Sequence, residues 1–347
     1  MVRRTTLRVF DANLLFLIGS LMFFTIGYTV QQRELYTGLI ITQLAVVLLP
    51  PILYLEIFRM DVRKLLRVNR ISVKQGILAG LITIFMYPAA VTGNLIMFNI
   101  LTRIGTIDIP EMPTATTPIE YIRLMLIVSL MAGVCEEVFF RGFVLRGYEK
   151  LGQRKAIIIS AILFGMFHYN LYNLLGATVL GLVFGTLVWA TNSLYAGIIG
   201  HIVNNGLAIT LGYVFNLMAD ILPAGELELA EVTLNDSLLA SLIFFGVLAV
   251  VGMGISLYLY RKLKLTTTPL STNQLSEPYK QDPETETSVT ETKNEEEEES
   301  GEALAEELEE VLEEESVQWW EYFPLTGVIP LFINVAVIQI SMLLGRF

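Results

Sequence analysis

Long, nearly unbroken apolar runs fill most of this 347-residue chain. A helix needs about 20 mostly apolar residues to cross the hydrocarbon core of a bilayer. Eight runs of this kind precede the last quarter of the chain, and we expect membrane helices at Leu14–Val30, Leu35–Phe58, Gly76–Leu101, Ile122–Val144, Ala156–Tyr169, Leu174–Ala190, Leu194–Met218 and Leu238–Tyr260. A ninth run, Leu325–Leu344, is long enough to span once more. The predicted fold class is all-α, a polytopic transmembrane helix bundle of about eight core helices plus a C-terminal one.

The charges are concentrated in one acidic segment. Residues Thr266–Ser316 hold 18 of the 34 acidic residues and only two lysines, so the rest of the chain carries a net charge of +5. Only 16% of all residues are charged and 54% are hydrophobic, whereas a soluble domain carries about a quarter charged residues. This composition excludes a soluble enzyme and a nucleic-acid-binding protein. The single cysteine, Cys135, excludes a disulfide scaffold.

These patterns predict four parts. We expect an N-terminal helical pair at 1–70, a core at 71–264, an acidic disordered linker at 265–316 and a C-terminal transmembrane helix at 317–347. The linker is rich in Thr, Ser, Glu and Pro, which bury too little apolar surface to fold. Leucine and valine at helical spacing within Glu302–Glu315 predict a short helix there. We assign no partner to this segment.

The loops between the runs alternate in charge. Basic residues gather at the N-terminus and after the second, fourth and eighth runs, whereas the loops after the third and seventh runs are acidic. Cytoplasmic loops carry the excess of Lys and Arg. We therefore expect a cytoplasmic N-terminus and linker, with Phe347 outside. No cleavable signal peptide or organelle address is evident, so we expect a bacterial plasma membrane.

Ionisable residues are rare inside the runs, and each is a candidate for function because charge is costly there. The fourth run contains Glu136, Glu137 and Arg141. Glu137 and Arg141 are four residues apart on one helix face, which favours an ion pair. Glu136 points about 100° away and has no partner on its own helix. Burial of such a carboxylate favours a role as general base.

The two histidines of the chain both lie in membrane runs. His168 closes the fifth run and His201 lies in the seventh, at depths that allow both to meet Glu136. His201 and Asn205 are four residues apart, so they share a face. Together they could offer two hydrogen-bond donors to one oxygen, as an oxyanion requires.

The motifs Glu-Glu-x-x-x-Arg at 136–141, Phe-x-x-x-His at 164–168 and His-x-x-x-Asn at 201–205 resemble those of the CAAX protease and bacteriocin-processing family of intramembrane endopeptidases. The resemblance covers roughly residues 70–215. It implies that Glu136 with His168 activates a water, that His201 and Asn205 stabilise the oxyanion, and that Glu137 and Arg141 support the site. It implies hydrolysis of a peptide or protein substrate, free or membrane-anchored, without a cofactor or a metal.

Two alternatives remain open at this stage. The polar residues could only hold helices together in a non-catalytic immunity or scaffold protein. A metal-dependent hydrolase is the other, because Glu136, His168, His201 and Asn205 are all residue types that ligate metals. Other intramembrane protease classes fit less well. The chain lacks the His-Glu-x-x-His motif of zinc proteases, paired aspartates in its core membrane runs, and a Gly-x-Ser-x-Gly-like nucleophile motif.

Overall fold

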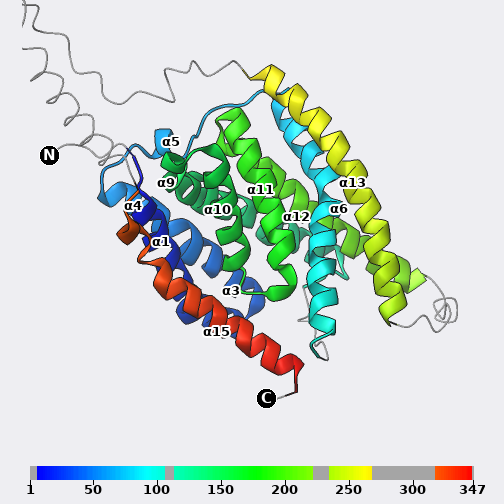
Figure 1. Ribbon diagram of the computed structural model, residues 1–347. Helices are drawn as coiled ribbons and strands as arrows, with labels where there is room; N and C mark the ends of the chain where they lie inside the picture. Colours follow the sequence, from blue (N-terminus) through cyan, green and yellow to red (C-terminus); the bar gives the residue numbers. More distant parts are fainter. Residues whose placement is uncertain (1–5, 106–112, 222–233, 268–316, 346–347) are drawn as a thin grey trace, which may run out of the picture. The chain divides into compact units, whose positions relative to one another are not determined.

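A computed structural model describes residues 6–105, 113–221, 234–267 and 317–345 (Figure 1). The described residues up to Thr266 and those from Trp319 onward belong to one compact unit. The described residues contain helices and no strand, which confirms the all-α class. The acidic linker and the short helix expected in it lie outside the described residues.

Every apolar run expected from the sequence corresponds to helical structure. The N-terminal pair consists of α1 (Val9–Met22), η1 (Phe23–Gly27) and α2 (Tyr28–Arg33), followed by α3 (Leu35–Ile41), η2 (Thr42–Leu48) and α4 (Leu49–Ile57). The fourth run comprises α7 (Pro118–Leu124), η3 (Met125–Met131), α8 (Ala132–Glu137), η4 (Val138–Val144) and α9 (Leu145–Gly147). The other helices are α5 (Val62–Leu65), α6 (Val73–Thr102), η5 (Glu149–Leu151), α10 (Gln153–Phe167), η6 (Leu171–Asn173), α11 (Leu174–Thr191), α12 (Leu194–Ile221), α13 (Leu234–Thr266), η8 (Trp319–Tyr322) and α15 (Leu325–Leu343).

Seven of these helical stretches in the described part are long and apolar enough to cross a membrane. Two expected stretches are not among the seven. Pro118–Gly147 carries Glu136, Glu137 and Arg141, and α10 is only 15 residues long. Both carry candidate site residues. The site is therefore built on the least typical membrane helices of the bundle.

Local sequence signals set several helix ends. Ser72 and Gln75 form a capping box at the start of α6, and Thr117 and Glu120 form another at the start of α7. Each box satisfies backbone N–H groups that a helix start leaves unpaired. At the other end of α11, Asn192 adopts a left-handed conformation, with φ of 49°. Asparagine tolerates this conformation better than most residues, so the chain can turn directly into α12.

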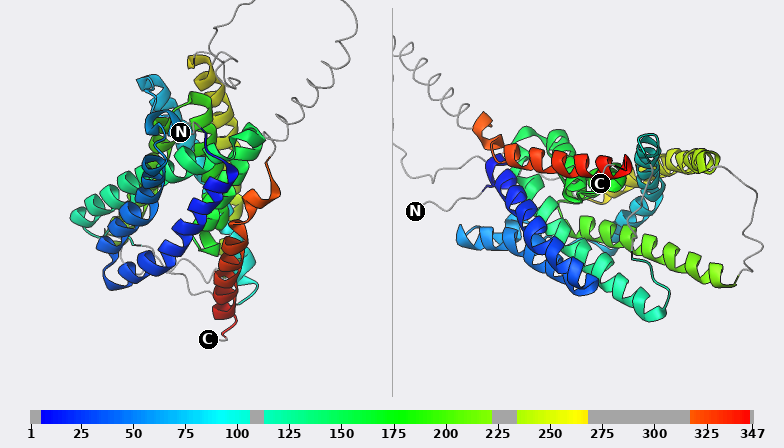
Figure 2. Two further views of the ribbon diagram at one scale, coloured as in Figure 1. Left: turned by 90° about the vertical axis from the view of Figure 1, so that its left-hand side faces the viewer. Right: turned by 90° about the horizontal axis from the view of Figure 1, so that it is seen from below.

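Helix α11 packs against both α6 and α10. α6 packs against α11, α12 and α13, and α10 packs against α11 (Figure 1). The last helix, α15, lies against α1, so the first and last helices of the described chain are neighbours, although the two termini lie apart (Figure 2). In α11, Gly181 approaches α10 so closely that an added Cβ would lie 2.7 Å from the Ala161 Cα. Small residues thus allow these helix backbones to approach each other.

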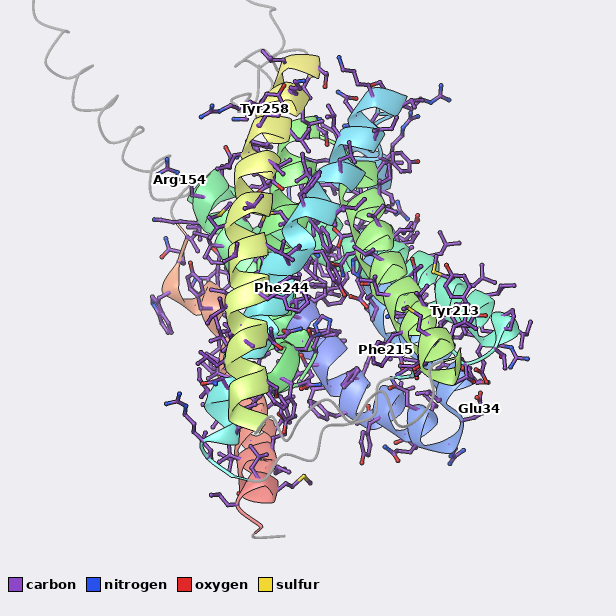
Figure 3. The ribbon with its side chains drawn as sticks, turned by 90° about the vertical axis from the view of Figure 1, so that its right-hand side faces the viewer. Glu34, Arg154, Tyr213, Phe215, Phe244 and Tyr258 are labelled. Atoms are coloured by element: carbon purple, nitrogen blue, oxygen red, sulfur yellow. The ribbon has the colours of Figure 1, made fainter. Side chains whose placement is uncertain are left out.

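The outer surface of the bundle is apolar. Along α13, large side chains such as Phe244, Val250 and Tyr258 are more than half exposed (Figure 3). In water such a surface would favour association, whereas in a bilayer it contacts lipid tails. Arg154 and Tyr258 lie in the upper part of the bundle in Figure 3, Glu34 lies in the lower part, and Tyr213 lies between these levels.

Candidate active site

The four residues predicted from the sequence to act in catalysis line one cavity, whereas Glu137 and Arg141 are buried outside its wall. The volume of the cavity is about 450 Å³, and Glu136, His168, His201 and Asn205 are all in its wall. Much of the remaining wall is apolar, with side chains such as those of Leu39, Ala90, Val91, Leu124 and Ile127. A small number of polar groups in a mostly apolar cavity of this size is typical of a ligand site.

Glu136 lies between two side chains from other helices. Its Oε1 accepts a hydrogen bond of 2.8 Å from Nε2 of Gln43, in η2. Its Oε2 is 3.8 Å from Nε2 of His201, which is too far for a hydrogen bond. The Glu136 side chain is 15% exposed. The carboxylate is therefore held from one side while its second oxygen remains available at the cavity.

Glu137 joins a fully buried network on the other side of the same helix. Its Oε1 accepts hydrogen bonds from Nη1 of Arg141, at 2.8 Å, and from Nδ1 of His201, at 2.9 Å. The ion pair with Arg141 that the sequence predicts is thus present. The contact with His201, 64 residues away, was not predicted. Because the Glu137 carboxylate accepts from Nδ1, that nitrogen carries a proton, and Nε2 of His201 faces Glu136.

Arg141 is itself held from three directions. Beyond Glu137, its Nη2 donates to the Gly181 carbonyl at 3.2 Å, and its guanidinium lies 4.4 Å from the centre of the Phe164 ring. Only 1% of the residue is exposed. A buried cation is tolerated only when it is paired and hydrogen-bonded, and both conditions are met here. Arg141 therefore fixes Glu137, which in turn orients His201.

His168 ends α10 and has a defined tautomer. Its Nδ1 is 2.9 Å from the Phe164 carbonyl oxygen, one helical turn earlier. A carbonyl can only accept, so Nδ1 carries the hydrogen and the lone pair of the neutral ring is on Nε2. Phe164 packs edge-on against both histidine rings, 4.9 Å from His168 and 5.8 Å from His201. One phenylalanine thus positions both histidines.

Asn205 is oriented by its neighbours on two helices. Its Nδ2 donates to the Val128 carbonyl at 2.8 Å, and its Oδ1 accepts from Nδ2 of Asn204 at 2.9 Å. An amide nitrogen has two hydrogens, so one remains for a ligand in the cavity. Asn205 can therefore donate to bound substrate while its orientation stays fixed.

Two further features bear on the alternatives. Within the described ranges, no group of three or more His, Cys, Asp or Glu side chains is placed to hold a metal ion. Cys135 precedes Glu136 but is buried and does not line the cavity. Chelation of the purified protein tests whether its activity depends on a metal.

Gln43 and Asn204 are site residues that the sequence interpretation missed. Both line the cavity, and each donates to one of the four candidate residues. Both side chains are neutral amides, so the high cost of burying charge, which singled out the ionisable residues, gave no signal for them. An uncharged polar residue in an apolar run is also costly in a membrane, and this signal could have identified Gln43.

Known proteins resemble the part of the chain that carries this site. Residues 118–207 match the family described as type II CAAX prenyl endopeptidase Rce1-like. This match confirms the resemblance indicated by the three motifs. A Bacillus subtilis (strain 168) protein named "Putative membrane peptidase YdiL" is 33% identical over 95 residues, which are 27% of this chain and 39% of that protein. No solved structure matches the chain. The family match covers the segment that carries the site, and the similar Bacillus subtilis protein is named a membrane peptidase.

Proposed function

We propose that this protein is an intramembrane endopeptidase that hydrolyses a peptide bond with a water activated by a glutamate. The observation that carries the proposal is that Glu136, His168, His201 and Asn205, from three separate helical stretches, line one cavity. A scaffold protein would need such polar groups to hold its helices together, but it would not need them around a cavity.

The geometry supports a division of roles in the attack. A water between Glu136 and His168 would donate one hydrogen to Nε2 of His168 and the other to the Glu136 carboxylate. Its oxygen then attacks the carbonyl carbon of the scissile peptide bond while Glu136 takes the proton. When the carbon–nitrogen bond breaks, that proton passes to the leaving amine. Gln43 keeps the Glu136 carboxylate in place through its hydrogen bond to Oε1.

The donors for the oxyanion are on α12. Asn205 has one amide hydrogen that is not used by Val128, and Nε2 of His201 can donate when it carries a proton. The buried Glu137 then balances the positive charge of the ring. Both donors would be held in place before the substrate binds, which is what makes stabilisation of a transition-state charge effective.

The activity is tested with the purified full-length chain in nanodiscs and a panel of peptides, both free and lipid-anchored. We expect cleavage of at least one peptide that persists under exhaustive chelation. Glu136→Gln and His168→Ala should each lose on the order of 10²–10⁴ in rate while remaining folded. Loss of cleavage on chelation with recovery on added zinc would contradict the glutamate mechanism in favour of a metal hydrolase.

We also propose that the N-terminus faces the cytoplasm, because basic loops alternate with acidic ones. The test uses two exposed arginines at opposite ends of the second span, Arg33 and Arg63, each replaced by cysteine in a chain without Cys135. In intact cells, an impermeant thiol reagent should label Arg33→Cys and leave Arg63→Cys unlabelled. The opposite pattern would reverse the orientation.

A further inference from the structure

The chain leaves helical geometry immediately after His168. Tyr169 has φ of 48°, a left-handed conformation, and Asn170 is extended before η6 begins. The side chain of Asn170 accepts a hydrogen bond from the Tyr172 N–H at 2.9 Å. The Tyr169 carbonyl and the Leu171 N–H, on either side of Asn170, need other partners. Irregular backbone in a membrane protein is stable only where the protein itself satisfies those groups.

One side chain from the far end of the sequence satisfies both groups. Oε1 of Gln339 accepts the Leu171 N–H at 3.0 Å, and Nε2 of Gln339 donates to the Tyr169 carbonyl at 2.7 Å. Gln339 is in α15, about 170 residues further along the chain. A glutamine amide supplies one acceptor and one donor side by side, which matches the two backbone groups.

The rest of α15 packs against the same turn. The Phe332 ring lies 6.3 Å from the Tyr169 ring, and Leu343 is buried together with Leu171 and Leu101. Phe332, Ala336, Gln339 and Leu343 recur at intervals of four, three and four residues, so they form one helix face. That face is the one that contacts the turn after His168.

We propose that Gln339 is a positioning residue for His168, and that α15 holds the active-site turn from outside residues 118–207. This inference rests on the proposed function, in which His168 binds the reacting water. Without Gln339, the Tyr169 carbonyl and the Leu171 N–H lose their hydrogen-bond partners. Because Tyr169 is held in a left-handed backbone conformation, the turn then relaxes. His168 then moves relative to Glu136, because the turn is continuous with its own backbone.

The experiment compares Gln339→Met with Asn334→Met. Methionine has nearly the length of glutamine but makes neither hydrogen bond. Asn334 is an exposed amide on the same helix, so its replacement is the matched control. Because the chain has only two histidines, nuclear magnetic resonance of full-length protein labelled with ¹⁵N-histidine reports His168 and His201 separately. We expect Gln339→Met to change the His168 signal and its tautomer, while the His201 signal and the whole Asn334→Met spectrum stay unchanged.

The kinetic arm uses a peptide cleaved by the wild type. Gln339→Met should lower kcat by about 10–100-fold with KM within about twofold, because small misplacement of a catalytic group has effects of this size. Wild-type His168 signals and kcat in a folded Gln339→Met protein would overturn the proposal. If no peptide is cleaved by the wild type, the proposed function fails, whereas the His168 spectrum still tests the role of Gln339.

A second variant decides the matter if Gln339→Met does not fold. In Gln339→Glu, a neutral carboxyl group can accept from Leu171 and donate to Tyr169, but an ionised one can only accept. Its kcat should approach that of the wild type at low pH and fall at higher pH, where the wild type stays active. A wild-type pH profile for Gln339→Glu would contradict the proposal.

Discussion

Residues 118–207 and the helices on either side of them contribute to the cavity in different ways. The matched segment supplies the charged groups and both histidines of the site: Glu136, Glu137, Arg141, His168 and His201. The flanking helices supply neutral amides. Gln43 binds Glu136 from the N-terminal side, and Gln339 binds the turn after His168 from the C-terminal side.

This difference indicates that the matched segment carries the groups that react, whereas the flanking helices hold those groups in place. Charged groups can move protons or stabilise a transition state, but each requires a buried partner. Amides carry no charge, so they can be placed on membrane helices at lower cost and still fix a partner by donating and accepting at once. We therefore expect substitutions in the matched segment to have larger effects than substitutions in the flanks.

Among the neutral amides of the site, the largest effect is expected at Asn205. Asn205→Ala should lower kcat on the order of 10²–10³ with little change in KM, because its donor acts on charge that exists only in the transition state. Asn216, on the same helix, also donates to a backbone carbonyl, that of Ala115, and is the matched control. Steady-state kinetics of Asn205→Ala and Asn216→Ala check this, and equal losses in both would contradict the role in the oxyanion site.

The next effect, on stability and on kcat, is expected in the buried network of Glu137, Arg141 and His201. Glu137→Ala leaves Arg141 without its carboxylate partner, and breaking a buried ion pair from one side costs about 3–5 kcal/mol. Adding Arg141→Met should recover much of the free energy of unfolding. It should not recover kcat, because His201 still lacks the partner of its Nδ1. Denaturant unfolding and kinetics of both variants separate the two roles, and full recovery of kcat in the double variant would show that Glu137 only balances charge.

A smaller effect is expected in the N-terminal flank. Gln43→Leu removes the hydrogen bond to Glu136 without adding a charge, so kcat should fall by about tenfold. Gln31 donates to Thr42 in the same helical pair and does not line the cavity, which makes Gln31→Leu the control. The comparison of kcat in these two variants tests whether the flank supports the site. Identical rates would confine the active site to the matched segment.

The smallest effect is expected outside the cavity wall, at the start of α3. Hydrogen bonds to Thr37 and Tyr36 hold the pKa of the Glu34 carboxyl below its ordinary value of 4.5. Because the folded-state pKa is the lower one, this cap stabilises the fold fully above pH 4.5 and is lost as the pH falls through the folded-state pKa. The Tm difference between wild type and Glu34→Gln should therefore vanish on acidification. A Tm difference that does not change with pH would show that ionisation of Glu34 is not its cause.

The sequence predicted the parts of the molecule that depend on local patterns. The apolar runs predicted the bounds of the long helices to within a few residues. For example, the run Gly76–Leu101 corresponds to the observed helix Val73–Thr102. Helical spacing predicted the pair of Glu137 and Arg141, because residues four apart are neighbours on any helix. Depth along the helices indicated that His168, His201 and Glu136 meet.

Such local patterns could not predict contacts between helices that are distant in the sequence. The hydrogen bonds of Gln43 to Glu136, Glu137 to His201 and Gln339 to Leu171 join residues 93, 64 and 168 positions apart. Which helix faces which depends on the packing of the whole bundle. The π-helical turn of η4, directly after Glu137, also changes the register there, and its residues give no sequence signal.

The central claim is that the neighbours Glu136 and Glu137 differ in role, one acting on water and the other supporting His201. The most direct measurement compares Glu136→Gln with Glu137→Gln, which make the same change one residue apart, for kcat and for free energy of unfolding. We predict that Glu136→Gln is stable and loses on the order of 10²–10⁴ in kcat. We predict that Glu137→Gln loses several kcal/mol of stability because Arg141 lacks a counter-charge. A Glu136→Gln protein that cleaves at the wild-type rate would contradict the account.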